Sequence, residues 1–168
     1  MISTRRVAGV VAAAALGVGL PVCLVAQTAN GLLAGVGPVG AQGLGTGVHA
    51  EFAYVAALPV ARLSARLEGS VSAWSRSVDS AARASRRLSS VGVAVERPFG
   101  EGRLQPFLVL GAATYARPGQ GLAGGGSAGV GIRYTLGPIS LHSEVRMHRI
   151  AGDNARGPIP FVLGIQFR

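Results

Sequence analysis

Apolar and polar residues alternate along most of the chain after residue 43, which predicts β-strands rather than helices. The segment 139–150 illustrates the pattern, because Ile139, Leu141 and Val145 would share one face while Ser140 and His142 share the other. Seven such segments can be recognised: 43–58, 61–76, 86–99, 103–117, 127–136, 139–150 and 159–168. All alternate clearly except 103–117, which is apolar on both faces.

The connections between these segments alternate between short and long: Pro59-Val60, 77–85, 100–102, 118–126, Gly137-Pro138 and 151–158. Transmembrane β-barrels have short periplasmic turns and longer outer loops. The turn after 43–58 is short and therefore periplasmic, so this strand descends from the outer side. An exported chain starts in the periplasm, so a further ascending strand must precede 43–58. We place it at 28–38, with 39–42 as the first outer loop. The prediction is an all-β, up-and-down antiparallel transmembrane barrel of eight strands.

A soluble lipocalin-like barrel would show the same alternation with its apolar face inside. The polar face here is rich in Gly and Ser, which suits a narrow lumen. Aromatic residues of the apolar face lie near the predicted periplasmic strand ends, as in an interfacial girdle: Tyr54, Phe99, Tyr134 and Phe167. Trp74 and Phe161 would form a thin outer girdle. Charges on the apolar face also lie near strand ends, where they cost least: Arg87, Arg97 and Arg149. These observations favour lipid outside the barrel.

The first residues have the features of a secretory signal. Arg5 and Arg6 precede an almost unbroken apolar run over 7–25, and cleavage after Ala26 would leave 27–168 as the mature barrel domain. An uncleaved membrane anchor is the alternative, and a lipoprotein signal at Cys23 is disfavoured by the bulky residue before it. Cys23 is the only cysteine, so the mature chain could form neither a disulfide framework nor a cysteine metal site.

The charge balance is strongly basic, with 16 basic residues, all of them Arg, against 7 acidic ones, a net charge of +9. Such a balance raises the possibility of nucleic-acid binding. The arginines form no tract, however, and no RNA-binding aromatic motif accompanies them, so we expect no nucleic-acid partner. The Gly-rich segment 119–126 lacks the Lys-Ser/Thr pair of a nucleotide-binding loop and is expected to be a flexible outer loop.

The alternation, the unequal connections and the closing segment 159–167 resemble the small eight-stranded outer-membrane barrels of the OmpA and OmpX type. In that family an alternating C-terminal strand with a terminal aromatic is the signal recognised by the barrel-insertion machinery. The resemblance implies that Phe161, Leu163, Ile165 and Phe167 carry this signal and that the insertion machinery is a partner. Arg168 follows the aromatic, which departs from the usual ending.

The polar face carries both charge signs and all three histidines. An eight-stranded interior is just wide enough for side chains to fill it, and buried charges must pair. We therefore expect a lumenal network that plugs the barrel, made by Glu51, Arg66, Glu68, Glu96, Arg133, His142, Glu144 and Arg146. Arg62, His49 and His148 have the same parity and are expected on the same face.

Two other interpretations of these residues are weaker. Ser140, His142, Glu144 and His148 share a strand face and could suggest a metal or catalytic cluster, but a polar lumenal ladder accounts for them better. The aspartates, Asp79 and Asp153, fall in predicted outer loops without the partners of a hydrolase triad. We expect no enzyme activity, no cofactor and no metal.

Several arginines cluster at the predicted outer strand ends, where bidentate contacts to lipopolysaccharide phosphates are expected: Arg76, Arg83, Arg86, Arg87, Arg117 and Arg156. Arg149 lies at the same end. A solvated basic rim is the alternative. The sequence thus predicts a monomeric outer-membrane barrel with a structural or envelope role, in contact with outer-membrane lipid. A surface module that binds or adheres through its outer loops, and a soluble periplasmic ligand-binding barrel, are the other candidates.

Overall fold

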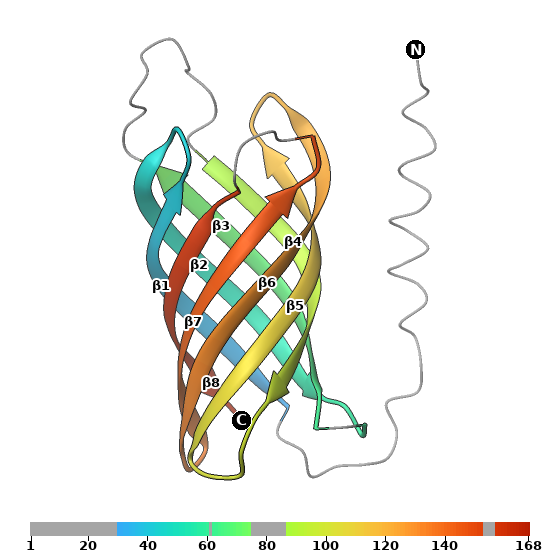
Figure 1. Ribbon diagram of the computed structural model, residues 1–168, viewed down its shortest axis with the longest axis vertical. Helices are drawn as coiled ribbons and strands as arrows, with labels where there is room; N and C mark the ends of the chain where they lie inside the picture. The colour runs from blue at the N-terminus through green and yellow to red at the C-terminus, as the bar shows by residue number, and fades with distance from the viewer. Residues whose placement is uncertain (1–29, 61, 75–86, 153–156) are drawn as a thin grey trace.

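The computed structural model describes residues 30–60, 62–74, 87–152 and 157–168. They form eight strands: β1 (Gly31–Ala41), β2 (Gly45–Ala57), β3 (Ser64–Trp74), β4 (Arg87–Pro98), β5 (Leu104–Arg117), β6 (Gly121–Leu136), β7 (Ile139–Ile150) and β8 (Ile159–Phe167). Each strand pairs antiparallel with the next, and β8 pairs with β1, so the sheet closes into a barrel of obliquely tilted strands (Figure 1). The predicted eight-stranded up-and-down architecture is confirmed.

The barrel has two ends, which we call the terminal end, where the first strand begins and the last strand finishes, and the far end. At the terminal end β1 begins and β8 finishes, and the connections 58–63, 99–103 and 137–138 reverse the chain (Figure 1). At the far end the connections are 42–44, 75–86, 118–120 and 151–158. The predicted signal segment 1–26 lies outside the described residues.

The predicted connections differ from the structure in three places. β1 continues to Ala41 instead of ending at residue 38, so the first reversal is the tight turn 42–44. The larger error concerns 118–126, predicted as a flexible loop. Only 118–120 is a turn, closed by a 3.1 Å hydrogen bond from the Gln120 amide to the Arg117 carbonyl, and β6 starts at Gly121. At the terminal end, 58–63 is longer than the predicted two-residue turn.

Three glycines of β6 make room for atoms of the neighbouring strands, including side chains that fill the barrel. A Cβ on Gly131 would meet the Phe107 ring, with Cε1 only 2.7 Å away. A Cβ on Gly125 would lie 2.8 Å from Cε2 of Tyr115, and one on Gly129 would lie 3.1 Å from Cβ of Arg146. Glycine at these positions therefore reflects interior crowding and not chain flexibility.

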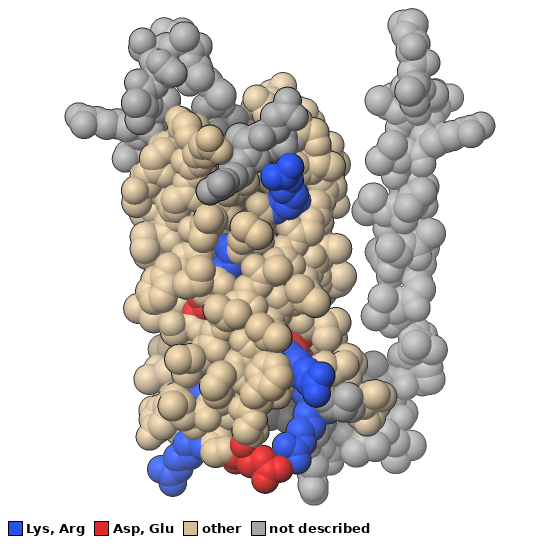
Figure 2. All heavy atoms as spheres, in the orientation of Figure 1, with Lys and Arg blue, Asp and Glu red and all other residues tan. Residues whose placement is uncertain are grey.

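The outer wall is apolar. Large hydrophobic side chains point outward from every strand, among them Val36, Phe52, Leu67, Val91, Leu110, Val130, Met147 and Leu163. On the face shown in Figure 2, the middle of the wall is almost entirely uncharged and most charged residues lie toward the lower, terminal end. A soluble barrel would turn these side chains inward, so the wall suits a lipid surrounding. No helix in the described residues is long and apolar enough to cross a membrane.

Four of the predicted girdle residues lie where the pattern placed them. Tyr54, Phe99, Tyr134 and Phe167 are exposed on the outer wall or its rim at the terminal end. Phe161 also faces outward. The prediction for Trp74 is wrong, because its side chain is only 4% exposed and points into the barrel. Trp74 shares the parity of Arg66 and Ser72, so the strict alternation of β3 requires it to face inward.

The seam between β1 and β8 has an interrupted ladder. Its register passes from Val36 opposite Leu163 directly to Val39 opposite Pro160, leaving out the two rungs between. Pro38 lies within this gap and has no N–H to donate, and Pro160 borders it. The ladder between β1 and β2 is continuous past the same proline, so the interruption is confined to the closing seam.

Candidate functional site: the barrel interior

The centre of the lumen holds three arginines and three glutamates, which we call the ionic layer: Arg66 and Glu68 of β3, Glu96 of β4, Arg133 of β6, and Glu144 and Arg146 of β7. Every second residue of a strand faces the same way, so the parity of these strands turns all six side chains inward. The layer carries equal numbers of positive and negative groups, as a buried region requires.

Arg66 stands at the middle of the ionic layer and its side chain is 1% exposed. One terminal nitrogen, Nη1, donates to Oε2 of Glu144 at 2.8 Å. The other, Nη2, donates to Oε2 of Glu96. A single guanidinium thus links β3 to β4 and, across the lumen, to β7.

The pairs continue outward from Arg66 in alternating sign. Arg133 donates from Nη2 to Glu96 Oε1 at 2.5 Å, and Arg146 donates from Nε to Glu144 Oε1 at 2.5 Å. Arg146 also donates from Nη1 to Glu68. The order of groups is Arg133, Glu96, Arg66, Glu144, Arg146, Glu68, so each charge except the two at the ends lies between two opposite charges. Loss of one member would leave its neighbours buried without full compensation.

Two rings hold the ionic layer in place. The Phe107 ring stacks on His142 with centroids 5.1 Å apart, and the Arg66 and Arg133 guanidinium carbons lie 5.3 and 5.5 Å from its centroid. His142 Nε2 forms a 3.0 Å hydrogen bond with Glu144 Oε2. Because Gly131 admits the Phe107 ring, a glycine of β6 and the ion pairs depend on the same aromatic side chain.

The structure brings seven of the eight predicted lumenal residues together and separates one. Glu51 lies inside the barrel next to His49, with 3.8 Å between its Oε2 and His49 Nε2, and it is not a member of the alternating series described above. The prediction that Arg62 faces the lumen is wrong. Arg62 lies in the 58–63 turn with φ 56° and pairs with Glu101 at 2.6 Å, and both side chains are well exposed. The expected strand 61–76 begins only at Ser64, which explains the error for Arg62.

Toward the far end a second set of hydrogen-bonded polar side chains follows the ionic layer. His49 Nδ1 and Ser72 Oγ are 2.8 Å apart, and the Tyr115 hydroxyl is 2.8 Å from His148 Nδ1. The Tyr115 and His148 rings meet edge to face. Ser72 and Tyr115 were not among the predicted site residues. Strand parity places Ser72 on the polar face of β3, whereas the segment 103–117 is apolar on both faces and gave no such signal for Tyr115.

The far end of the lumen is closed by an apolar cluster, which we call the apolar cap: Val39, Trp74, Leu88, Tyr115 and Ile150. All five side chains are at most 6% exposed. They come from five strands, β1, β3, β4, β5 and β7, so the cluster spans the width of the barrel. A mouth filled in this way keeps water from the ionic layer beneath it.

Ser72, His49 and Glu51 have the residue types of a hydrolase triad, but their geometry does not suit catalysis. His49 presents Nε2 to Glu51 at 3.8 Å, beyond hydrogen-bond distance, so the acid does not orient the ring. The adjacent cavity has a volume of about 10 Å³, enough for roughly one water molecule. No group of three or more potential metal-ligating residues occurs among the described residues.

The predicted outer arginines divide into two sets. Arg76, Arg83, Arg86 and Arg156 lie outside the described residues. Arg87 and Arg117 begin β4 and end β5 at the far end, and each interacts with another residue. Arg149, near the end of β7, is exposed on the outer wall. The proposed insertion-signal residues Phe161, Leu163, Ile165 and Phe167 all face outward from β8.

Comparison with known sequence families finds no match, and comparison with curated proteins finds none either. Solved structures do match. Neisserial surface protein A (NspA) superposes with a TM-score of 0.66 at 13% identity, over 82% of this chain and 96% of that one. The outer membrane enzyme PagL superposes with a TM-score of 0.54 at 16% identity, over 82% and 99%. The closed eight-stranded barrel, its outward apolar wall and these superpositions together show that the chain has the fold of the small outer-membrane β-barrels.

Proposed function

We propose that this protein is a monomeric integral outer-membrane barrel with a structural role in the cell envelope, and that its lumen does not conduct. The observation that carries the proposal is the filled interior. The ionic layer occupies the middle of the barrel and the apolar cap occupies the far end. Charged groups in an open pore would face water, whereas Arg66, Glu96 and Glu144 are almost completely buried.

Two measurements test this proposal. The purified protein should migrate differently on a gel before and after heating, as a stable membrane barrel does, and it should partition with outer membranes in the absence of detergent. In planar bilayers it should give no steady conductance. Recovery of the unheated protein in the soluble fraction would contradict the membrane proposal. Steady single-channel currents would contradict the closed lumen alone, so the two parts can fail separately.

Lipopolysaccharide is the proposed partner at the far end. Arg87 and Arg117 lie there, and the connection 75–86 between β3 and β4 contributes Arg76, Arg83 and Arg86 by sequence. Guanidinium groups bind phosphate bidentately. We expect Arg87→Gln combined with Arg117→Gln to weaken binding to lipopolysaccharide in a detergent pull-down, whereas Arg62→Gln at the terminal end should not. Equal binding by both variants would reject this partner.

A surface-binding role is the second candidate. The far-end connection 75–86 between β3 and β4 is longer than any other connection between the strands. Replacing 77–84 with a short Gly-Ser linker should abolish binding of the protein to host cells or matrix if the loop acts as an adhesin. A structural barrel would keep its envelope phenotype after the same replacement. The barrel-insertion machinery remains a proposed partner, through the outward face of β8.

A further inference from the structure

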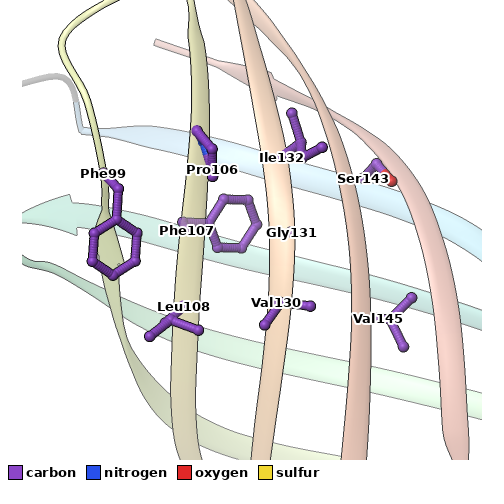
Figure 3. Close-up of a pocket in the computed structure, with 9 residues that line it drawn as sticks. All are labelled: Phe99, Pro106, Phe107, Leu108, Val130, Gly131, Ile132, Ser143 and Val145. Atoms are coloured by element: carbon purple, nitrogen blue, oxygen red, sulfur yellow. The ribbon is translucent and has the colours of Figure 1, made fainter.

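The outer wall carries a groove near the terminal end, across β5, β6 and β7. It has a volume of about 400 Å³ and is apolar except for the Ser143 hydroxyl. Figure 3 shows Phe99 at one end, Ser143 and Val145 at the other, and Gly131 with the Phe107 ring between them. The hollow lies beside the outward-facing Pro106 and Ser143, which are smaller than the Leu108, Val130 and Ile132 side chains around them; Gly131, a lumen-facing position, contributes only backbone to the groove.

Neighbouring positions place a cation at the mouth of this groove. Across the wall, Arg97 pairs with Leu108, Leu108 with Val130, and Val130 with Val145. The last three residues line the groove, so Arg97 is the next position in the same row. The Arg97 guanidinium carbon also lies 5.8 Å from the ring centroid of Phe99, which lines the groove as well.

Arg97 is exposed and has no carboxylate partner within the described part of the chain. It lies near the end of β4, beside the aromatic residues of the terminal end. In a membrane this is the level of the lipid headgroups, where an arginine is tolerated. A guanidinium in this position is able to bind an anionic headgroup, and the adjoining groove is able to accept an acyl chain.

We propose that this groove is a binding site for one anionic phospholipid of the periplasmic leaflet, with its phosphate on Arg97 and an acyl chain along Leu108, Val130 and Val145. The proposal rests on the membrane location given under the proposed function. The site is distinct from the far-end arginines, which lie at the opposite end of the barrel. An anionic lipid is preferred over a zwitterionic one because a zwitterionic headgroup carries an ammonium that Arg97 repels and that neutralises the neighbouring phosphate.

The test is native mass spectrometry of the full chain in detergent, with added phosphatidylglycerol or phosphatidylethanolamine of identical acyl chains. Wild type should retain phosphatidylglycerol about tenfold better, because the ammonium of phosphatidylethanolamine competes with Arg97 for the phosphate that both lipids carry. Arg97→Gln should lose the preference, and Arg97→Lys should keep part of it. The control Arg149→Gln removes an exposed wall arginine at the far end and should retain the preference.

Filling the groove tests its apolar half. Ser143→Leu should reduce retention of both lipids, and Val145→Phe provides a second filling variant. Ala128→Leu, on the wall of β6 outside the groove, is the matched control and should change nothing. Equal retention of the two lipids by wild type, or undiminished retention by both filling variants, would overturn the proposal. Failure of wild type to insert into vesicles would instead overturn the proposed function, so the two failures are distinguishable.

Discussion

The ionic layer and the apolar cap fill the same cylinder in opposite ways. Both are built from inward-facing residues at alternate strand positions, and both include residues of β3, β4 and β7. The ionic layer holds charges that each need an opposite charge close by, whereas the cap holds side chains that need only fill space. The difference teaches that the cap seals the lumen and the ionic layer specifies which strands face one another across it.

The largest expected effect is in the ionic layer. Glu144→Ala should leave Arg66 and Arg146 without their shared carboxylate, at a cost of about 3–5 kcal/mol in unfolding free energy. Urea unfolding in detergent micelles, followed by loss of the heat-modifiable band, measures this. The matched control is Glu101→Ala, which breaks an exposed pair with Arg62 and should cost at most about 0.5 kcal/mol. Equal losses in both variants would show that the ionic layer does not stabilise the barrel.

The apolar cap should respond by a different mechanism. Ile150→Ala creates a cavity next to Trp74 and Leu88, and we expect a loss of about 2–4 kcal/mol. Unlike Glu144→Ala, this change should admit water at the far end, which a red shift of the emission from Trp74, the only tryptophan, would report. Met147→Ala, on the outer wall of the same strand, is the control and should leave the emission unchanged. An unshifted spectrum in Ile150→Ala would argue against the sealing role.

The glycine positions of β6 give a smaller effect. Gly131→Ala places a methyl group against the Phe107 ring, which itself packs on His142 and Arg66, so we expect a loss of about 1–3 kcal/mol. Gly124→Ala meets nothing within 4 Å and should be neutral or slightly stabilising. The unfolding midpoints of the two variants, measured in the same urea assay, should differ if crowding, and not strand geometry, is the reason for glycine at position 131. A neutral Gly131→Ala would contradict it.

The smallest loss of stability is expected at the hydrogen bond between Tyr115 and His148, which lies between the apolar cap and the ionic layer. Tyr115→Phe removes the hydroxyl that bonds His148 while leaving the ring in the apolar cap, and should cost about 0.5–1.5 kcal/mol. Its double-mutant cycle with Glu144→Ala should be nearly additive if cap and ionic layer act independently. A coupling above about 1 kcal/mol would show that the two regions form one unit.

Strand parity alone predicted most of the fold. Because one face of each strand is consistently apolar, the outward direction of residues such as Val130 and Leu163 could be inferred without coordinates. The same parity should have placed Trp74 inside, but its bulk and aromatic character suggested a membrane girdle. The lumenal position of Arg66 and Glu144 also followed from parity. Which carboxylate each arginine contacts did not, since partners such as Arg66 and Glu144 are on non-adjacent strands.

The glycines show where the sequence misled. In 121–126 the absence of side chains predicted a loop, since glycine usually weakens a strand. Within this segment Gly125 leaves the space that the Tyr115 ring of β5 occupies, whereas a Cβ on Gly121 or Gly124 would meet nothing within 4 Å. A single residue type can therefore signal either a turn or a crowded interior. Only the register between β5 and β6 separates the two.

The interrupted seam has a consequence for how the cylinder is assembled. β1 and β8 lie at opposite ends of the sequence, so their pairing carries the highest loop-closure cost of any in the barrel. Pro38 removes a donor from that same interface. We therefore expect closure of the cylinder to be the last step in its formation, and amide hydrogens flanking the gap to exchange with deuterium sooner than those of the continuous β5–β6 ladder.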